Sequence, residues 1–245
     1  MEQLRDLADA RLINGCVYCG GVADTRDHVP SRVFLDSPFP ENLPVVPACK
    51  PCNGGFSSDE EYVACLIEAA VMGTTNPDEM RRSRVAQILR RQHGLRSRIE
   101  ASKRDAEGLT SFAPDVDRVR NVLLKLARGH AAFELSSVPS DEPDYLSYWP
   151  LHTMGPEDRE AFEAPHFPEL FGEVGSRGLQ RTAVGVVTLV AESGDLVRKQ
   201  FIVTDWLDVQ EGRYRYLAYE TSSELVVRIV IGGYLACLII WASDP

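Results

Sequence analysis

The chain has 245 residues, which is enough to bury a substantial core and to form one large domain or two to three smaller ones. Its hydrophobic content of 44% and charged content of 25% are ordinary for a globular protein, and its net charge of −10 argues against indiscriminate coating of nucleic acid. The N-terminus lacks the features of a signal peptide, and the apolar run at 229–241 is too short to span a bilayer, so we expect a cytoplasmic protein with no membrane partner.

Charge is distributed unevenly along the chain. Residues 1–70 carry 5 Lys/Arg and 11 Asp/Glu (net −6), residues 71–135 carry 13 and 8 (net +5), and residues 136–245 carry 8 and 17 (net −9). A face that binds phosphate groups is therefore expected in the middle of the chain.

The first predicted unit covers residues 1–75. Helical spacing of apolar residues predicts a helix over 3–13, and a proline-rich stretch around 38–44 predicts a loop. A capping box at Ser57 or Ser58 begins a second helix, which Gly73 ends.

Two Cys-x-x-Cys pairs lie in this first unit, at Cys16/Cys19 and Cys49/Cys52. The spacing within each pair is typical of a tetrahedral zinc site, and four thiolates form a closed, structural site. Cys65 and Cys237 remain, and because both fall in apolar stretches we interpret them as core residues. The sequence therefore predicts a structural Zn²⁺ ion.

The second predicted unit, residues 76–135, is a basic helical region. Helices are expected from Asn76 to about His93, over 95–103, and from Pro114-Asp115 onward. The third unit, residues 136–245, is expected to be an irregular connection with short elements over 136–182 and then β-rich. Strand-like runs at 183–190, 198–203, 213–219, 224–231 and 234–241 predict an antiparallel meander of about four or five strands. The expected class is α+β.

Polar residues between and beside the cysteine pairs indicate more than a structural clamp. Asp27-His28-Val-Pro30, then Glu41-Asn42-Leu43, then Cys49-x-x-Cys52-Asn53 closely resembles the HNH endonuclease family, in its variant with two zinc knuckles. The resemblance covers about residues 14–62 and implies a zinc-stabilised, treble-clef-like ββα-metal core.

The resemblance assigns a role to each matched residue. His28 matches the general base that takes a proton from the attacking water, and an unperturbed imidazole is largely neutral at pH 7. Asp27 and Asn53 match the ligands of a catalytic Mg²⁺ or Mn²⁺ ion, while Asn42 matches the asparagine that holds the loop. The implied products are a 5′-phosphate and a 3′-hydroxyl. Asp59 or Glu60 is the alternative metal ligand, although helix capping also explains both.

Several arginines are candidates for contact with nucleic acid. Arg32 lies four residues after His28, where phosphate contact and an ordinary salt bridge are equally compatible with its position. The stretch 81–104 carries nine basic residues and a single acid, which predicts sequence-independent binding of DNA phosphates. The candidates named within it are Arg81, Arg82, Arg90, Arg91 and Arg96. A solvated helix packed on acidic neighbours is the alternative.

The sequence thus predicts a metal-dependent DNA endonuclease, with RNA as a further possible substrate. Two other functions stay open. One is a non-catalytic zinc finger that binds nucleic acid or acts as an adaptor. The other is a nuclease effector of a bacterial defence system, controlled by a protein or small molecule through residues 136–245.

Overall fold

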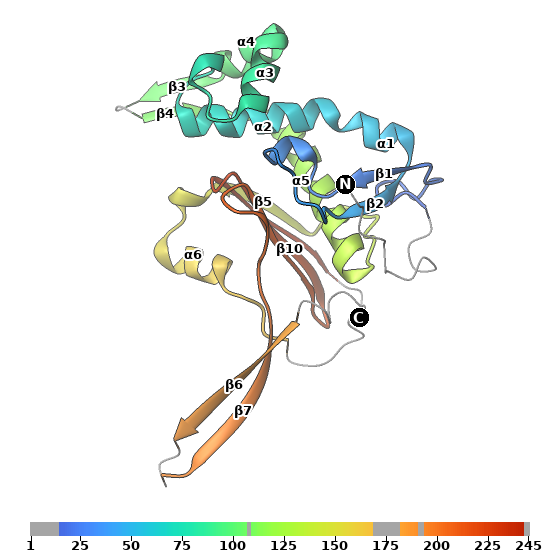
Figure 1. The fold of residues 1–245 in the computed structure, drawn as a ribbon, viewed down its shortest axis with the longest axis vertical. Coiled ribbons are helices and arrows are strands. Elements are labelled where there is room, and N and C mark those ends of the chain that lie inside the picture. Colours follow the sequence, from blue (N-terminus) through green and yellow to red (C-terminus); the bar gives the residue numbers. More distant parts are fainter. Residues whose placement is uncertain (1–14, 107–108, 169–181, 191–193, 243–245) are drawn as a thin grey trace.

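The computed structural model describes residues 15–106, 109–168, 182–190 and 194–242. These residues form a mixed α/β fold with a β-rich C-terminal part and a cysteine cluster near the N-terminus (Figure 1). The helix predicted over residues 3–13 lies outside the described residues.

The described chain begins with a short hairpin followed by a helix. β1 (Thr25–His28) pairs antiparallel with β2 (Val45–Ala48), and α1 (Lys50–Gly55) follows β2 directly. Pro51 lies in the first turn of α1, where its missing N–H has no helical partner to lose. The connection between the strands is a loop, as predicted, with one 3-10 turn at Arg32–Phe34.

Helices make up most of the next 80 residues. Their ends agree with local chemistry: Gly73 adopts a left-handed φ of 69° after α2, and the Asp115 side chain accepts a bond from the Arg118 amide at the start of α5. The elements are α2 (Ser57–Met72), the 3-10 turn Pro77–Glu79, α3 (Ser83–Arg91), α4 (His93–Ala101), the hairpin β3 (Lys103–Ala106) and β4 (Leu109–Phe112), and α5 (Val116–Leu135).

The C-terminal part contains a five-stranded antiparallel sheet with the order β5-β11-β10-β9-β8. β8 to β11 form a meander, and β5 joins its far edge by pairing with β11. The strands are β5 (Tyr145–Pro150), β8 (Leu207–Gln210), β9 (Tyr214–Glu220), β10 (Glu224–Ile231) and β11 (Leu235–Ala242), and α6 (Pro156–Glu163) follows β5.

Two further strands stay outside this sheet. β6 (Thr182–Val190) and β7 (Leu196–Thr204) pair only with each other, as a two-stranded ribbon that extends away from the rest of the structure (Figure 1). The prediction that runs 183–190 and 198–203 belong to the meander is therefore wrong. Strand propensity indicated both strands, but it carries no information about which strand pairs with which.

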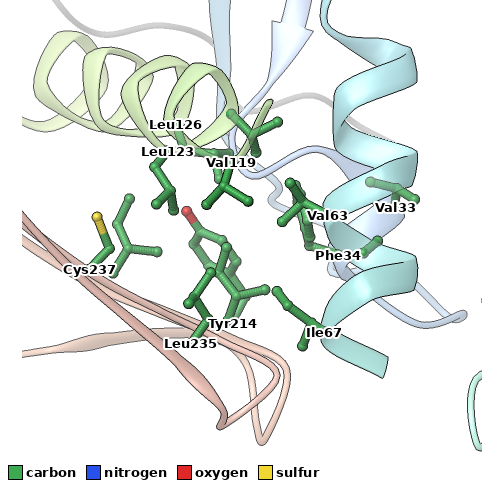
Figure 2. Packing of buried hydrophobic residues seen from close by; sticks show 14 of the residues in the cluster. Val33, Phe34, Val63, Ile67, Val119, Leu123, Leu126, Tyr214, Leu235 and Cys237 are labelled. Carbon is green, nitrogen blue, oxygen red and sulfur yellow. The ribbon is translucent and has the colours of Figure 1, made fainter. Parts of the chain in front are cut away.

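One hydrophobic cluster joins helices from the first half of the chain to the sheet. Side chains of α2 and α5 meet the inner face of the sheet there (Figure 2). Labelled members are Val63, Ile67, Leu123, Tyr214 and Cys237. Residues from the predicted units 1–75, 76–135 and 136–245 thus contribute to a single core, and Cys65 and Cys237 are buried in it as expected.

A close approach fixes α5 against the N-terminal hairpin. Gly129 of α5 lies beside Val29, the residue after β1, and a Cβ atom at position 129 would be 2.7 Å from Val29 Cγ2. Val29 is fully buried and β-branched, so its side chain has little room to move. The absence of a side chain at Gly129 therefore brings α5 into contact with the segment that carries Asp27 and His28.

Candidate metal centre and the polar site beside it

Four thiols converge at the N-terminal end of the described chain. The Sγ atoms of Cys16, Cys19, Cys49 and Cys52 all lie within 4.8 Å of one another, and those of Cys19 and Cys49 are 3.7 Å apart. Tetrahedral zinc with Zn–S bonds of about 2.3 Å requires sulfurs about 3.8 Å apart. The donor set and its spacing therefore fit a structural Zn²⁺ ion.

Local backbone structure brings the two pairs together. Cys16 and Cys19 lie on a tight turn, in which the Gly20 amide donates to the Cys16 carbonyl over 2.8 Å. Cys49 lies between β2 and α1, and Cys52 lies in the first turn of α1, where the Asn53 amide donates to the Cys49 carbonyl. One cysteine pair thus precedes β1 and the other follows β2, and the antiparallel pairing of these strands places the two pairs at the same end of the hairpin.

The thiol pKa values differ within the cluster: that of Cys16 is lowered, whereas burial and hydrogen bonds with the neighbouring thiols raise that of Cys52. Partial burial raises the pKa of Cys16, but interactions with the backbone amides of Cys49, Tyr18 and Cys19 outweigh burial and lower it to about 7. Because the thiolate is the form that binds metal, a lowered thiol pKa reduces the cost of deprotonation.

Asn53 contacts the face of β1 that carries the side chains of Thr25 and Asp27. Alternate residues of a strand share a face, so the side chains of Thr25 and Asp27 lie together. Asn53 of α1 donates from Nδ2 to Thr25 Oγ1 over 3.2 Å and to the Arg26 carbonyl over 3.1 Å. Within the described residues, the Oδ1 atoms of Asp27 and Asn53 have no hydrogen-bond donor.

The other carboxylate oxygen of Asp27 is fully engaged. Asp27 is 8% exposed, and its Oδ2 lies 2.7 Å from Lys125 Nζ and accepts a 2.8 Å hydrogen bond from the Tyr18 hydroxyl. Burial first, and then the charge of Asp27, raise the pKa of Tyr18 well above its ordinary value, so this hydroxyl remains a donor.

Lys125 extends this pair into a buried network. Its side chain is 1% exposed, and Nζ lies 2.8 Å from Glu60 Oε1 and donates to Ser31 Oγ over 2.7 Å. Ser31 in turn donates to Glu60. The network holds two carboxylates and one ammonium group, so it retains an excess negative charge.

Lys125 is a site residue that the sequence did not predict. The signal was its place on α5 between Leu123 and Leu126, where an amphipathic helix should present an apolar side chain.

His28 lies at the end of β1 beside Arg32. Nη2 of Arg32 is 2.9 Å from His28 Nε2, and because a guanidinium only donates, Nε2 accepts this bond with its lone pair. Burial lowers the pKa of His28, the positive charge of Arg32 lowers it further, and Asp27 acts in the opposite direction. Arg32 is thus placed at the site, and His28 is neutral at pH 7.

The remaining candidates lie farther from this group. Asn42 is exposed in the turn before β2, and within the described chain its side chain makes no hydrogen bond. Asp59 accepts hydrogen bonds of 2.7 Å from both Arg118 and Asn121, which ties it to α5. Of the two alternative metal ligands, only Glu60 is connected to Asp27.

The basic helical region divides into a buried and an exposed set. Arg82 is 6% exposed and donates to the Val33 and Leu35 carbonyls and to Asp36, so its prediction as a nucleic-acid contact is wrong. Its guanidinium instead ties α3 to the loop after His28. The other four candidates keep exposed or half-exposed side chains: Arg81, Arg90 (paired with Asp78), Arg91 (3.9 Å from Glu61) and Arg96.

Comparisons of the chain with known proteins do not identify its family. No protein-family model matches the chain, and neither a curated protein nor a solved structure matches it. Among the helices described, none is long and apolar enough to cross a membrane.

Proposed function

We propose that the chain is a metal-dependent endonuclease of the HNH type that hydrolyses phosphodiester bonds in DNA. One observation carries the proposal: neutral His28 adjoins Asp27, which shares a side of β1 with Asn53, in a hairpin–helix unit that also carries the four thiols. The resemblance of the sequence to the ββα-metal motif assigns these three residues to one catalytic site, and this supports the proposal.

The oxygen atoms at this site suit a hard divalent cation. The Oδ1 atoms of Asp27 and Asn53 have no donor among the described residues, and a carboxylate with an amide oxygen is a donor pair that Mg²⁺ and Mn²⁺ accept. When bound, the cation supplies a Lewis acid for the scissile phosphate and neutralises the departing 3′-oxygen.

The residues of the chain supply the proton transfer. His28 accepts the proton of the attacking water at Nε2, the atom that accepts from Arg32 in the structure. For water to reach that atom, the Arg32 guanidinium has to move aside, and a phosphate oxygen is a stronger acceptor for it than an imidazole. Substrate binding would thereby free the base.

The test is cleavage of supercoiled DNA, with RNA as a parallel substrate, in the presence of Mg²⁺ or Mn²⁺. His28→Ala should lower the rate about 10²–10⁴-fold, while zinc content and thermal unfolding stay unchanged. The matched control is His152→Ala, because His152 is exposed and lies outside the site. A His28→Ala protein that cuts at the wild-type rate would refute the assignment of the base.

The Lys125–Asp27 ion pair favours a second candidate, a zinc-stabilised module that binds nucleic acid or acts as an adaptor without cleaving it. An ammonium group already neutralises part of the carboxylate that would hold the cation. Absence of cleavage with every divalent ion, together with salt-sensitive DNA binding by the wild-type chain, would support this candidate over the nuclease.

A further inference from the structure

A cavity of about 150 Å³ lies where the helical part of the chain meets the five-stranded sheet. α2 and the residues just before α3 form one wall, and the β8–β9 and β10–β11 turns form the other. The Gly232 amide donates to the Arg213 carbonyl over 2.6 Å, which holds the two turns together. A cavity of this volume accommodates a benzene ring, so it can receive a ligand of about six to nine non-hydrogen atoms.

Much of the cavity wall is apolar. Ala64, Ile67 and Val71 contribute from α2, where their spacing of three and four residues places them on one helix face. Ile231, the last residue of β10, contributes from the sheet. Figure 2 shows Ile67 pointing from α2 toward the sheet. Because burial of each methylene group is favourable, such a wall selects a ligand with an aliphatic portion.

A buried carboxylate also lines this cavity. Glu68 of α2 is 4% exposed, and its Oε1 atom accepts a 3.1 Å hydrogen bond from the Arg82 amide. In the part of the chain that the structure describes, no side chain forms an ion pair with Glu68 or donates to it. Burial of a carboxylate without a counter-charge is costly. Glu68 therefore lacks a cationic donor that a ligand in the cavity could supply.

Three guanidinium groups line the same cavity. Arg82 and Arg213 share the carboxylate of Asp36, with Arg82 Nε 2.8 Å from Oδ1 and Arg213 Nε 2.5 Å from Oδ2. Arg81 is exposed, and no ion pair between described residues includes it. Three positive charges thus face two negative ones, those of Asp36 and Glu68. The excess positive charge lies with Arg81, which is free to bind an anionic group.

The two kinds of charge restrict the chemistry of the ligand. A simple cation would pair with Glu68 but would meet three guanidinium groups. A simple anion would pair with Arg81 but would leave Glu68 without a donor. A zwitterion satisfies both, because its ammonium group donates to the carboxylate and its own carboxylate accepts from the guanidinium. An aliphatic amino acid combines these two groups with a side chain that the apolar wall can cover.

We propose that the cavity binds a free amino acid with an aliphatic side chain, of the size of L-leucine. The ammonium group contacts Glu68, the carboxylate contacts the exposed Arg81, and the side chain packs against Ile67 and Ile231. The ligand bridges α2 and the turns of the sheet, so its binding stabilises the folded chain. The proposal concerns this cavity alone and does not depend on nuclease activity.

The test is isothermal titration calorimetry and thermal unfolding of the full chain, with L-leucine as the probe. We expect saturable binding at one site and a higher unfolding midpoint when L-leucine is present. Two analogues separate the charged contacts: isocaproate is L-leucine without the ammonium group, and isoamylamine is L-leucine without the carboxylate. Each should bind about 10-fold or more weakly, because each loses one hydrogen bond between charged groups.

Two substitutions locate the binding in this cavity. Glu68→Gln keeps an oxygen for the Arg82 amide but removes the negative charge, so it should raise the Kd for L-leucine about 10-fold or more. Val71→Trp adds a large side chain to the wall and should abolish binding. The matched control is Glu61→Gln, the same change on the same helix. Glu61 accepts from Gln92 and does not line the cavity, so its replacement should leave binding intact.

Several outcomes would overturn the proposal. A wild-type chain that does not bind L-leucine would do so, as would isocaproate or isoamylamine binding as tightly as L-leucine, because the ligand would then be a simple ion. Equal affinity of the wild type and Glu68→Gln for L-leucine would place the site elsewhere. Circular dichroism of each variant separates loss of binding from loss of folding, and the two analogues test the wild type without any substitution.

Discussion

Lys125 Nζ lies 2.7 Å from Oδ2 of Asp27 in the interior of the protein, and this contact ties α5 to the strand that carries His28. The ammonium group also neutralises part of the charge of Glu60. Lys125 therefore contacts both buried carboxylates of the site.

Replacing Lys125 tests how much of the structure depends on that cation. Lys125→Met keeps the length of the side chain but leaves Asp27 and Glu60 buried without their counter-charge, which should lower the free energy of unfolding by about 3–5 kcal/mol. Urea-induced unfolding measures the change. The control is Lys103→Met, which removes a more exposed lysine 3.7 Å from Asp105 and should cost less than about 1 kcal/mol. If both variants lowered the free energy of unfolding by the same amount, Lys125 would not have the stabilising role proposed for it.

Removing one thiol tests the structural metal. Cys49→Ser should abolish bound zinc and destabilise the N-terminal hairpin, because a structural zinc site contributes folding energy directly. Elemental analysis and thermal unfolding, with and without a chelator, provide the measurements. Cys65→Ala is the matched control, since Cys65 is buried in the core and outside the cluster. Zinc retained at the wild-type level in Cys49→Ser would argue against a four-thiolate site.

Substitutions of the adjacent residues Arg81 and Arg82 distinguish an arginine that stabilises the fold from one that contacts nucleic acid. Arg82→Gln should lower the free energy of unfolding by about 2–3 kcal/mol, because it removes hydrogen bonds to Asp36 and to two buried carbonyls. Arg81→Gln should leave stability within about 0.5 kcal/mol of wild type, because Arg81 is exposed. Arg81→Gln should instead weaken DNA binding, and the slope of log affinity against log salt concentration should fall by about one unit. Titrations at several salt concentrations would show the reverse pattern if Arg82 were the DNA contact.

The His166 ring stacks on Tyr219 of β9, with centroids 3.9 Å apart, and His166 makes the stability of this contact dependent on pH. Burial first, and then the positive charge of Arg228, lower its pKa below the ordinary value of 6.5, so the folded state disfavours the protonated ring. The stabilisation from the neutral ring is therefore full above pH 6.5 and is lost as the pH falls through the lowered pKa. His166→Phe keeps an aromatic ring on Tyr219 and should lack this part of the pH dependence. The free energy of unfolding is measured for both proteins between pH 7.5 and 5. If it changed by the same amount in both, His166 would not be the source of this pH dependence.

Truncation is a poor test of whether residues 136–245 control the site. Cutting the chain after α5 would expose the face of that helix that packs against β9, including Leu123 and Leu126. Point substitutions on the outer face of the sheet leave this core intact. Control of a nuclease effector through residues 136–245 stays a prediction for such experiments.

Local chemistry allowed much of the helical structure and the metal cluster to be predicted. Asp115 and Gly73 mark helix ends whose chemistry is contained in one or two residues, and the two cysteine pairs form the cluster that their spacing indicated. β5 was expected only as an unspecified short element, because a six-residue edge strand ending in Pro150 sits within a proline- and acid-rich segment that resembles loop. Lys125 and Arg82 were misjudged because the sequence does not show which long cationic side chains fold inward to distant carboxylates.

α5 contacts both the cysteine-bearing segment and the five-stranded sheet. These contacts limit which segments of the chain can be exchanged separately. Lys125 and His130 are five residues apart on α5, and the first contacts Asp27 while the second contacts the Tyr214 hydroxyl of the sheet over 2.7 Å. A recombination event that transferred the cysteine-bearing segment into another protein would therefore have to bring α5 with it, and with α5 a sheet shaped to receive it.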